Sequence, residues 1–176
     1  QETGLFEHQI NGPKNFAHRI GFQMNTIPAG QFADGGRGGL AILAKLPFGL
    51  KTVHSVVNQH GQILVCKVFG ANLSLTIINA YKRPGTAHDD LLTDLLETIQ
   101  QHGNQNWILC MDWNTDPSNV EAFIHPLGGR NVASAQHVAG SHPIDSIWLA
   151  QTLEVASSGT LDPLSDHEGM TVSIKE

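Results

Sequence analysis

The feature that most constrains the fold is a series of three apolar segments between residues 51 and 81. The stretch KTVHSVVNQHGQILVCKVFGANLSLTIINAY is rich in Val, Ile and Leu, and it is interrupted twice, by QHGQ and by GAN. Short apolar runs separated by Gly and Asn are typical of strands joined by tight turns. The sequence therefore predicts an antiparallel meander of three strands.

Other patterns predict helices and strands on both sides of this meander. Leu and Ile recur at helical spacing in TAHDDLLTDLLETIQQHG, where we expect Thr86 to cap a helix that Gly103 ends. Strands are expected in AHRIGFQM, from about Leu40 to Lys45, and in NWILCMDW, IDSIWLA and MTVSI. A short helix is expected around Ser118 to Ile124, and loops in GGRNVASAQHVAGSHP and LDPLSDHEG. These elements predict an α+β layered fold in a single domain, residues 1–176.

Composition narrows the class of protein. A chain of 176 residues buries a core without disulfides, and no apolar run approaches the length that spans a membrane. Cys66 and Cys110 lie in apolar runs, where we expect small buried side chains rather than a disulfide or a metal site. The formal net charge of −6 argues against a broad basic surface, although carboxylates that hold a divalent cation also make a chain acidic. The start of the chain has no signal-peptide pattern, and we expect an intracellular protein, cytoplasmic or nuclear.

Polar side chains stand where several apolar runs start or stop. Asp and Asn end strands routinely, so each one alone has a structural explanation. Asp112 and Asn114 are two positions apart and therefore share a face of the strand. Asp145 lies one residue inside the apolar run PIDSIWLA, where a buried charge needs a partner. The complete set is Glu2, Asn79, Tyr81, Asp112, Asn114, Asp145, Asp166 and His167.

Six short motifs follow one another along the chain: QET at 1–3, RGGLAIL at 37–43, NAYKRP at 79–84, MDWNT at 111–115, PIDSIWL at 143–149 and SDHEGMTVSI at 165–174. In this order they resemble the motifs of the endonuclease/exonuclease/phosphatase superfamily of metal-dependent phosphoesterases. The resemblance covers the whole chain. It implies a four-layer α/β/β/α sandwich with two mostly antiparallel sheets and a site where loops from both sheets meet.

The resemblance also implies a metal site and a group that activates the nucleophile. Glu2 matches the metal-binding glutamate, and Asp166 is expected near the ion. Asp112 matches the carboxylate that orients or deprotonates the attacking group, and Asn114 the amide that positions the phosphate and the nucleophile. Hard oxygen ligands of this kind suit Mg²⁺ or Mn²⁺.

The remaining site residues are expected to contact the substrate phosphate. By resemblance, Tyr81 hydrogen-bonds the phosphate, and His167 addresses a phosphate oxygen with Asp145 as its carboxylate partner. An Asp–His pair of this kind fixes the tautomer and charge of the imidazole. Expected substrate-binding residues are Asn79, Lys82 and Arg83.

The chain departs from the family pattern at its start. The family opens with a strand that carries an asparagine, then a helix and a second strand that ends in the Gln-Glu motif, and this sequence begins at that motif. We therefore expect an N-terminally truncated domain that lacks about one strand-helix-strand unit, roughly 30 residues. The two alternatives are a fragment of a larger polypeptide and a truncated form in which a central strand is absent. Gly169 also differs from the Pro or β-branched residue that the family more often has.

The leading interpretation is a phosphodiester hydrolase acting on nucleic acid, of the mobile-element or repair type. Alternatives are a phosphomonoesterase or phosphodiesterase for inositol phosphates, lipids or nucleotides, and an inactive remnant that serves as a binding module. The sequence does not indicate an oligomeric state. The basic residues expected at the rim of the site are few: Arg37, Lys82, Arg83 and Arg130.

Overall fold

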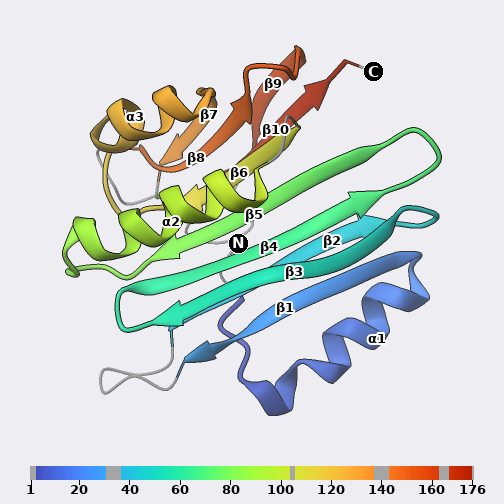
Figure 1. Cartoon of the computed structure of the whole chain (residues 1–176). Helices are drawn as coiled ribbons and strands as arrows, with labels where there is room; N and C mark the ends of the chain where they lie inside the picture. Colours follow the sequence, from blue (N-terminus) through green and yellow to red (C-terminus); the bar gives the residue numbers. More distant parts are fainter. Residues whose placement is uncertain (1–2, 31–36, 104–105, 137–142, 163–166, 176) are drawn as a thin grey trace.

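A six-stranded sheet forms the centre of the computed structural model, which describes residues 3–30, 37–103, 106–136, 143–162 and 167–175 (Figure 1). Its strands lie in the order β3 (Gly49–Asn58), β4 (Gly61–Phe69), β5 (Ser74–Lys82), β6 (Trp107–Asp112), β8 (Pro143–Ala150) and β7 (Gly129–Gln136). Neighbours are antiparallel except β5 and β6, which are parallel. A parallel pair requires a crossover, and the helix between these two strands supplies it.

Strand β4 shows why the sheet lies inside the molecule. Its first six residues are all buried. Ile63 and Val65 face one core, which also contains helix residues such as Leu91, whereas Leu64 and Cys66 face a second core on the opposite side, with Ile27 of another pair of strands. A strand covered on both faces reads as a continuous apolar run, which is how ILVC at 63–66 appears in the sequence.

The second β layer consists, in the described residues, of two separate two-stranded antiparallel sheets. One joins β1 (Phe22–Gly30) to β2 (Arg37–Lys45) and packs over β3, β4 and β5. The other joins β9 (Val155–Leu161) to β10 (Gly169–Ile174) and packs next to β7. The expected two sheets are therefore present as one large sheet and two hairpins.

Helices complete the layers (Figure 1). Helix α1 (Asn11–Arg19) packs against β1. Helices α2 (His88–His102) and α3 (Ser118–Ile124) cover the other face of the large sheet, over a core that includes Leu91, Leu95 and Val120. Short 3₁₀ helices, Glu7–Gln9 and His125–Leu127, precede α1 and follow α3. Of the described helices, none is long and apolar enough to cross a membrane.

The structure confirms the α+β fold, the antiparallel meander and the helices around 88–102 and 118–124. It differs from the sequence expectations in four places. AHRIGFQM is the end of α1 and the start of β1, the segment from Gly129 to Gln136 is a strand rather than a loop, and β9 was not anticipated. Thr86 does not cap α2, because its hydroxyl donates to the Arg83 carbonyl at 2.8 Å and Ala87 occupies the N-cap position.

The C-terminal end of α2 is held against the large sheet by His102. Its ring stacks on His54 of β3, with centroids 4.8 Å apart and planes inclined by 24°. Its carbonyl accepts a hydrogen bond from the Thr76 hydroxyl of β5 at 3.2 Å. Burial, and then the neighbouring charges of His54 and Lys67, lower the pKa of His102 from its ordinary value of 6.5. The folded chain therefore binds a proton at His102 less tightly than the unfolded chain does.

This difference predicts an acid-sensitive contribution to stability. Because the folded-state pKa is the lower one, the contribution is complete above about pH 6.5 and declines as pH falls through the folded-state pKa. We expect His102→Gln to flatten the acid side of the curve of Tm against pH, relative to His125→Gln, which changes an exposed histidine. Thermal melts between pH 4.5 and 8 measure this. Parallel curves for the two variants would contradict it.

Candidate active site

Four buried polar side chains form a row across four neighbouring strands. Gln62 of β4 is in register with Tyr81 of β5, Tyr81 with Asp112 of β6, and Asp112 with Asp145 of β8. They are 1%, 2%, 3% and 4% exposed, in that order. Neighbouring strands are about 4.8 Å apart, and Tyr81 belongs to the core between the large sheet and the β1–β2 hairpin. The row therefore lies on the face of the large sheet that meets the second β layer.

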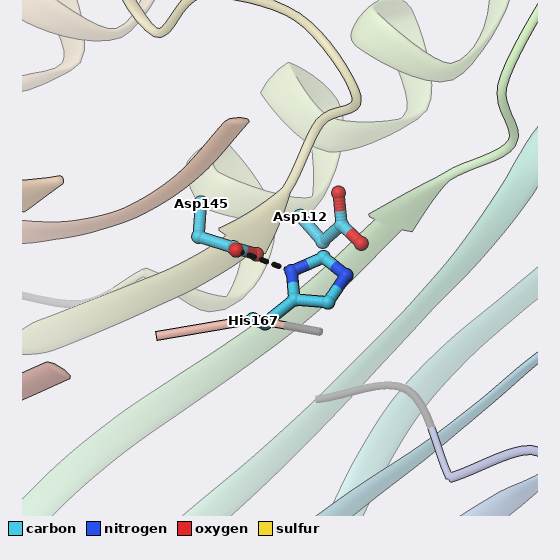
Figure 2. A group of neighbouring side chains, drawn as sticks. All are labelled: Asp112, Asp145 and His167. Atoms are coloured by element: carbon cyan, nitrogen blue, oxygen red, sulfur yellow. Dashed lines mark hydrogen bonds and ion pairs between the residues drawn. The ribbon is translucent and has the colours of Figure 1, made fainter. Parts of the chain in front are cut away.

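His167, which precedes β10, reaches this row from the second β layer. Its Nδ1 lies 2.6 Å from Asp145 Oδ2, and the ring lies next to both carboxylates in Figure 2. One possible ligand atom from each of Asp112, Asp145 and His167 lies within 4.8 Å of the others. The His167 side chain is 30% exposed and that of Asp145 is 6%. The expected contact between Asp145 and His167 is confirmed, and the two carboxylates and the imidazole form one group.

The turn after β6 fixes the Asp112 carboxylate. Asn114 has a left-handed backbone with φ of 49°, and its N–H donates to Asp112 Oδ1 at 3.1 Å. Its side-chain Nδ2 donates to the Lys82 carbonyl at 2.7 Å. Trp113 between them is fully buried and its N–H donates to the Ile144 carbonyl at 3.0 Å. The turn is therefore anchored to the ends of both β5 and β8.

Lys82 and Arg83 follow Tyr81 at the end of β5. Lys82 is only 4% exposed, and its Nζ donates to the Arg83 carbonyl at 3.3 Å. Burial lowers the pKa of Lys82, and the negative charge of Asp112 partly offsets that shift. Arg83 is half-buried and donates from Nη1 to the Gln59 carbonyl at 3.0 Å. Substrate binding by these two residues stays a prediction, and the Lys82 charge is placed to stabilise ionised Asp112.

Asn79 connects the two β layers beside the site. It is 2% exposed, lies two residues before Tyr81 on the same face of β5, and donates from Nδ2 to the Ala41 carbonyl of β2 at 3.2 Å. Its buried Oδ1 has no hydrogen-bond partner within the described ranges. Asn79 therefore holds β2 over the row, and its substrate-binding role stays a prediction.

Gln62 is the member of the row that the sequence interpretation missed. Its Oε1 accepts from the Gly39 N–H at 2.6 Å and its Nε2 donates to the Pro28 carbonyl at 2.9 Å. These bonds tie β4 to both strands of the first hairpin. The sequence signal was a single polar residue one position inside the apolar run GQILVC, where an amide requires buried partners.

The family model described as "Endonuclease/Exonuclease/phosphatase family" matches residues 1–167. The chain belongs to this family. Among solved structures, the endonuclease domain of TRAS1, a telomere-specific non-LTR retrotransposon, superposes with a TM-score of 0.70 at 11% identity, covering 93% of this chain and 89% of that one. No curated protein sequence matches the chain significantly.

Two further family structures are similar. The human Nocturnin catalytic domain has a TM-score of 0.68 at 17% identity, with 98% of this chain and 79% of that one covered. D. rerio TDP2, determined with a single-strand DNA product, has a TM-score of 0.64 at 14% identity, with 98% and 83% covered. At such identities the likeness shows the fold, and the sandwich expected from the sequence motifs is confirmed.

Members of this family are typically hydrolases of phosphoester bonds and usually use divalent metals. The donors of the described group fit a hard cation, because Asp112 and Asp145 offer carboxylate oxygens. Cys66 and Cys110 are free thiols outside this group, and burial raises the pKa of both. The expected metal ligands Glu2 and Asp166 lie outside the described residues.

The bonds of Gln62 predict a structural cost when its side chain is removed. Gln62→Ala would leave the buried Gly39 N–H unpaired, and losing such a partner costs about 1–3 kcal/mol. We expect the free energy of unfolding to fall by that amount in urea titration. Gln100→Ala, at an exposed position of α2, is the matched control and should change it by less than about 0.5 kcal/mol. Equal effects of the two substitutions would contradict the bracing role of Gln62.

Proposed function

We propose that this chain is a divalent-metal-dependent phosphodiester hydrolase that acts on nucleic acid. The observation that carries the proposal is the group formed by Asp112, Asp145 and His167, with the 2.6 Å contact between the last two. Phosphodiester hydrolysis requires a positioned nucleophile and relief of negative charge on the phosphate. The group supplies a carboxylate for the first requirement and an imidazole for the second.

His167 is proposed to stabilise charge on the phosphate. Because Asp145 lies against Nδ1, it favours a proton on that nitrogen and directs Nε2 toward the substrate side. The protonated ring then donates from Nε2 to a non-bridging phosphate oxygen. That hydrogen bond strengthens as negative charge develops in the transition state, which is the condition for acceleration rather than simple binding.

Asp112 is proposed to orient the attacking water and accept its proton. The Asn114 N–H holds one carboxylate oxygen, which fixes the plane of the group. The Lys82 charge stabilises its ionised form. Tyr81 stands in register beside Asp112, and we propose that its hydroxyl contacts the same phosphate. Asn114, through its amide, keeps this turn aligned with the end of β5.

We propose Glu2 and Asp166, together with a carboxylate of the described group, as the residues that would hold the cation, Mg²⁺ or Mn²⁺. Bound there, such an ion neutralises charge on the phosphate oxygens and lowers the pKa of a coordinated water. Carboxylate and amide oxygens favour these ions over zinc.

The choice of nucleic acid is supported by two of the similar structures, the endonuclease domain of TRAS1 and the D. rerio TDP2 complex with single-strand DNA product. A phosphomonoester substrate is the second candidate, because a mannosyl-6-phosphatase from Bacteroides thetaiotaomicron has the same fold, with a TM-score of 0.63 at 13% identity. Assays therefore need single- and double-stranded oligonucleotides, a small phosphodiester and a sugar monophosphate side by side.

The proposed roles predict a loss of turnover rather than of affinity. Asp112→Asn and His167→Ala should each lower kcat on the order of 100-fold or more, because each removes an interaction made in the transition state. Arg83→Ala should act chiefly on KM. Asp89→Asn and His125→Ala, at exposed positions, are matched controls with little expected effect. Unchanged kcat for Asp112→Asn on every substrate would refute the catalytic assignment, and hydrolysis of the monophosphate alone would refute the choice of nucleic acid.

Metal dependence gives a separate prediction. Activity should disappear after exhaustive chelation and return with Mg²⁺ or Mn²⁺, because the site otherwise lacks the charge that neutralises the phosphate. Zn²⁺ at the same concentration should restore less activity than Mg²⁺ or Mn²⁺. The measurement is the initial rate during metal titration of the chelated protein, with circular dichroism to show that chelation leaves the fold intact. Full activity in excess chelator would overturn the proposal.

A further inference from the structure

The formal charge of the chain is divided between its two parts. Residues 1–88 contain eight of the ten Lys and Arg residues and three carboxylates, Glu2, Glu7 and Asp34, whereas residues 89–176 contain thirteen carboxylates and two basic residues. The first part forms α1 and β1 to β5, and the second forms α2, α3 and β6 to β10. The net charge of −6 therefore hides a cationic region made by the first five strands.

Two lysines of this region face each other on the large sheet. Lys51 of β3 is the direct cross-strand partner of Lys67 of β4. Lys67 shares a face with Val65, which belongs to the core under α2, so both ammonium groups lie on the helix side of the sheet. Both are exposed, and neither forms an ion pair or hydrogen bond with any part of the chain that the structure describes. Like charges placed directly opposite each other destabilise a sheet, and a bound anion would remove that cost.

The stacked pair of His54 and His102 borders these lysines. The charged groups that lower the pKa of His102, after burial, are His54 and Lys67, and both are basic. The local field at this edge of α2 is therefore positive. Glu97, the last carboxylate of α2, is exposed and stands five residues before His102.

Two exposed phenylalanine rings continue the surface. Phe69 is 50% exposed and lies two residues after Lys67. It packs over its cross-strand partner Gly49 so closely that a side chain at position 49 would not fit, since its Cβ would lie 2.3 Å from the ring. Phe48 is 39% exposed and packs on Gly70, where an added Cβ would come within 2.8 Å. Both rings are thus held down on glycine backbone and still present part of their surface to solvent.

We propose that this cationic-aromatic patch, formed by Lys51, Lys67, Phe69, His54 and His102, is a second binding site that takes single-stranded nucleic acid. The two ammonium groups meet backbone phosphates, and a base stacks on Phe69. A positively charged surface with aromatic platforms is the arrangement that binds single strands without sequence preference. Rings packed against glycine backbone suit stacking better than insertion into lipid, which needs side chains that project.

The patch is separate from the candidate active site. It lies at the end of the sheet where β4 finishes and β5 begins, at the tips of the hairpins on the right of Figure 1. Strand β5 runs from there to Lys82 over roughly 25 Å at about 3.3 Å per residue. The patch also faces the helix side of the sheet, whereas Asp112 and Asp145 face the second β layer. Binding there does not require catalysis and does not rest on the proposed phosphodiesterase activity.

The test compares two charge-matched double variants. Lys51→Gln with Lys67→Gln removes two charges from the patch, and Lys14→Gln with Lys175→Gln removes two charges elsewhere and gives the same net charge. Fluorescence anisotropy of a labelled single-stranded oligonucleotide is measured in chelator, so that no strand is cut, at several salt concentrations. Only the first pair should weaken binding, on the order of tenfold at low salt, and reduce the slope of log K against log salt by about 1.4, since each phosphate contact contributes about 0.7.

The aromatic part has its own comparison. Phe69→Leu keeps the cover over Gly49 but removes the aromatic face on which a base would stack. It should weaken the binding of the single-stranded oligonucleotide about fivefold or more and have a smaller effect on the binding of a duplex. Phe123→Leu, at an exposed position of α3, is the control. Thermal melts confirm that each variant is folded. Equal salt slopes for the two double variants would overturn the proposal, as would oligonucleotide binding that is unchanged while binding to phosphatidylserine vesicles is lost.

Discussion

Two buried carboxylates in register on neighbouring strands are the constraint on which the rest of the structure depends. Asp112 and Asp145 are 3% and 4% exposed and face each other across β6 and β8. Like charges placed in this way repel, and each also loses its hydration. The arrangement is stable only if neighbouring groups supply hydrogen bonds and positive charge. The turn N–H of Asn114, the charge of Lys82 and the imidazole of His167 all serve this purpose.

These compensating groups come from distant parts of the chain, which makes the layered fold necessary. Lys82 ends β5, Asn114 follows β6, and His167 precedes β10 of the second β layer. His167 reaches Asp145 only because the β9–β10 hairpin packs beside β7, over a core that includes Met170 and Val172. Packing of that hairpin therefore brings the imidazole of His167 to Asp145, and a loosened hairpin would remove this contact.

The sequence predicted the elements whose local pattern and final environment agree. The meander and α2 have strong apolar periodicity, and both are buried as that periodicity requires. Strands β7 and β9 were missed because their residues are small and polar and β9 is almost entirely exposed, so no apolar alternation marks them. Helix α1 was missed because Gly12 and Pro13 indicate a turn, although Pro is tolerated in the first turn of a helix.

The contact of Asp145 with His167 was expected from the ordered motifs, whereas the bracing by Gln62 and Asn79 was not. Their partners, Gly39, Pro28 and Ala41, lie on another layer, and such pairing leaves no trace in local spacing. The burial of Lys82 was missed for the same reason, since a lysine after a strand reads as a solvent-exposed rim residue.

Net charge argues against a broad basic surface but does not report on a local one, for a physical reason. Screening limits electrostatic interaction to about 8–10 Å at ordinary ionic strength, which is shorter than the large sheet. A bound polyanion therefore responds to the residues near it and not to the sum of −6. Under the proposed function, an anionic substrate at the carboxylate group requires a cation to offset Asp112 and Asp145. The proposed patch at Lys51 and Lys67 requires no cation to bind an anion. The two proposals therefore predict different dependences, on divalent metal at the first surface and on monovalent salt at the second, and this difference allows the two contributions to nucleic-acid binding to be measured separately in one protein.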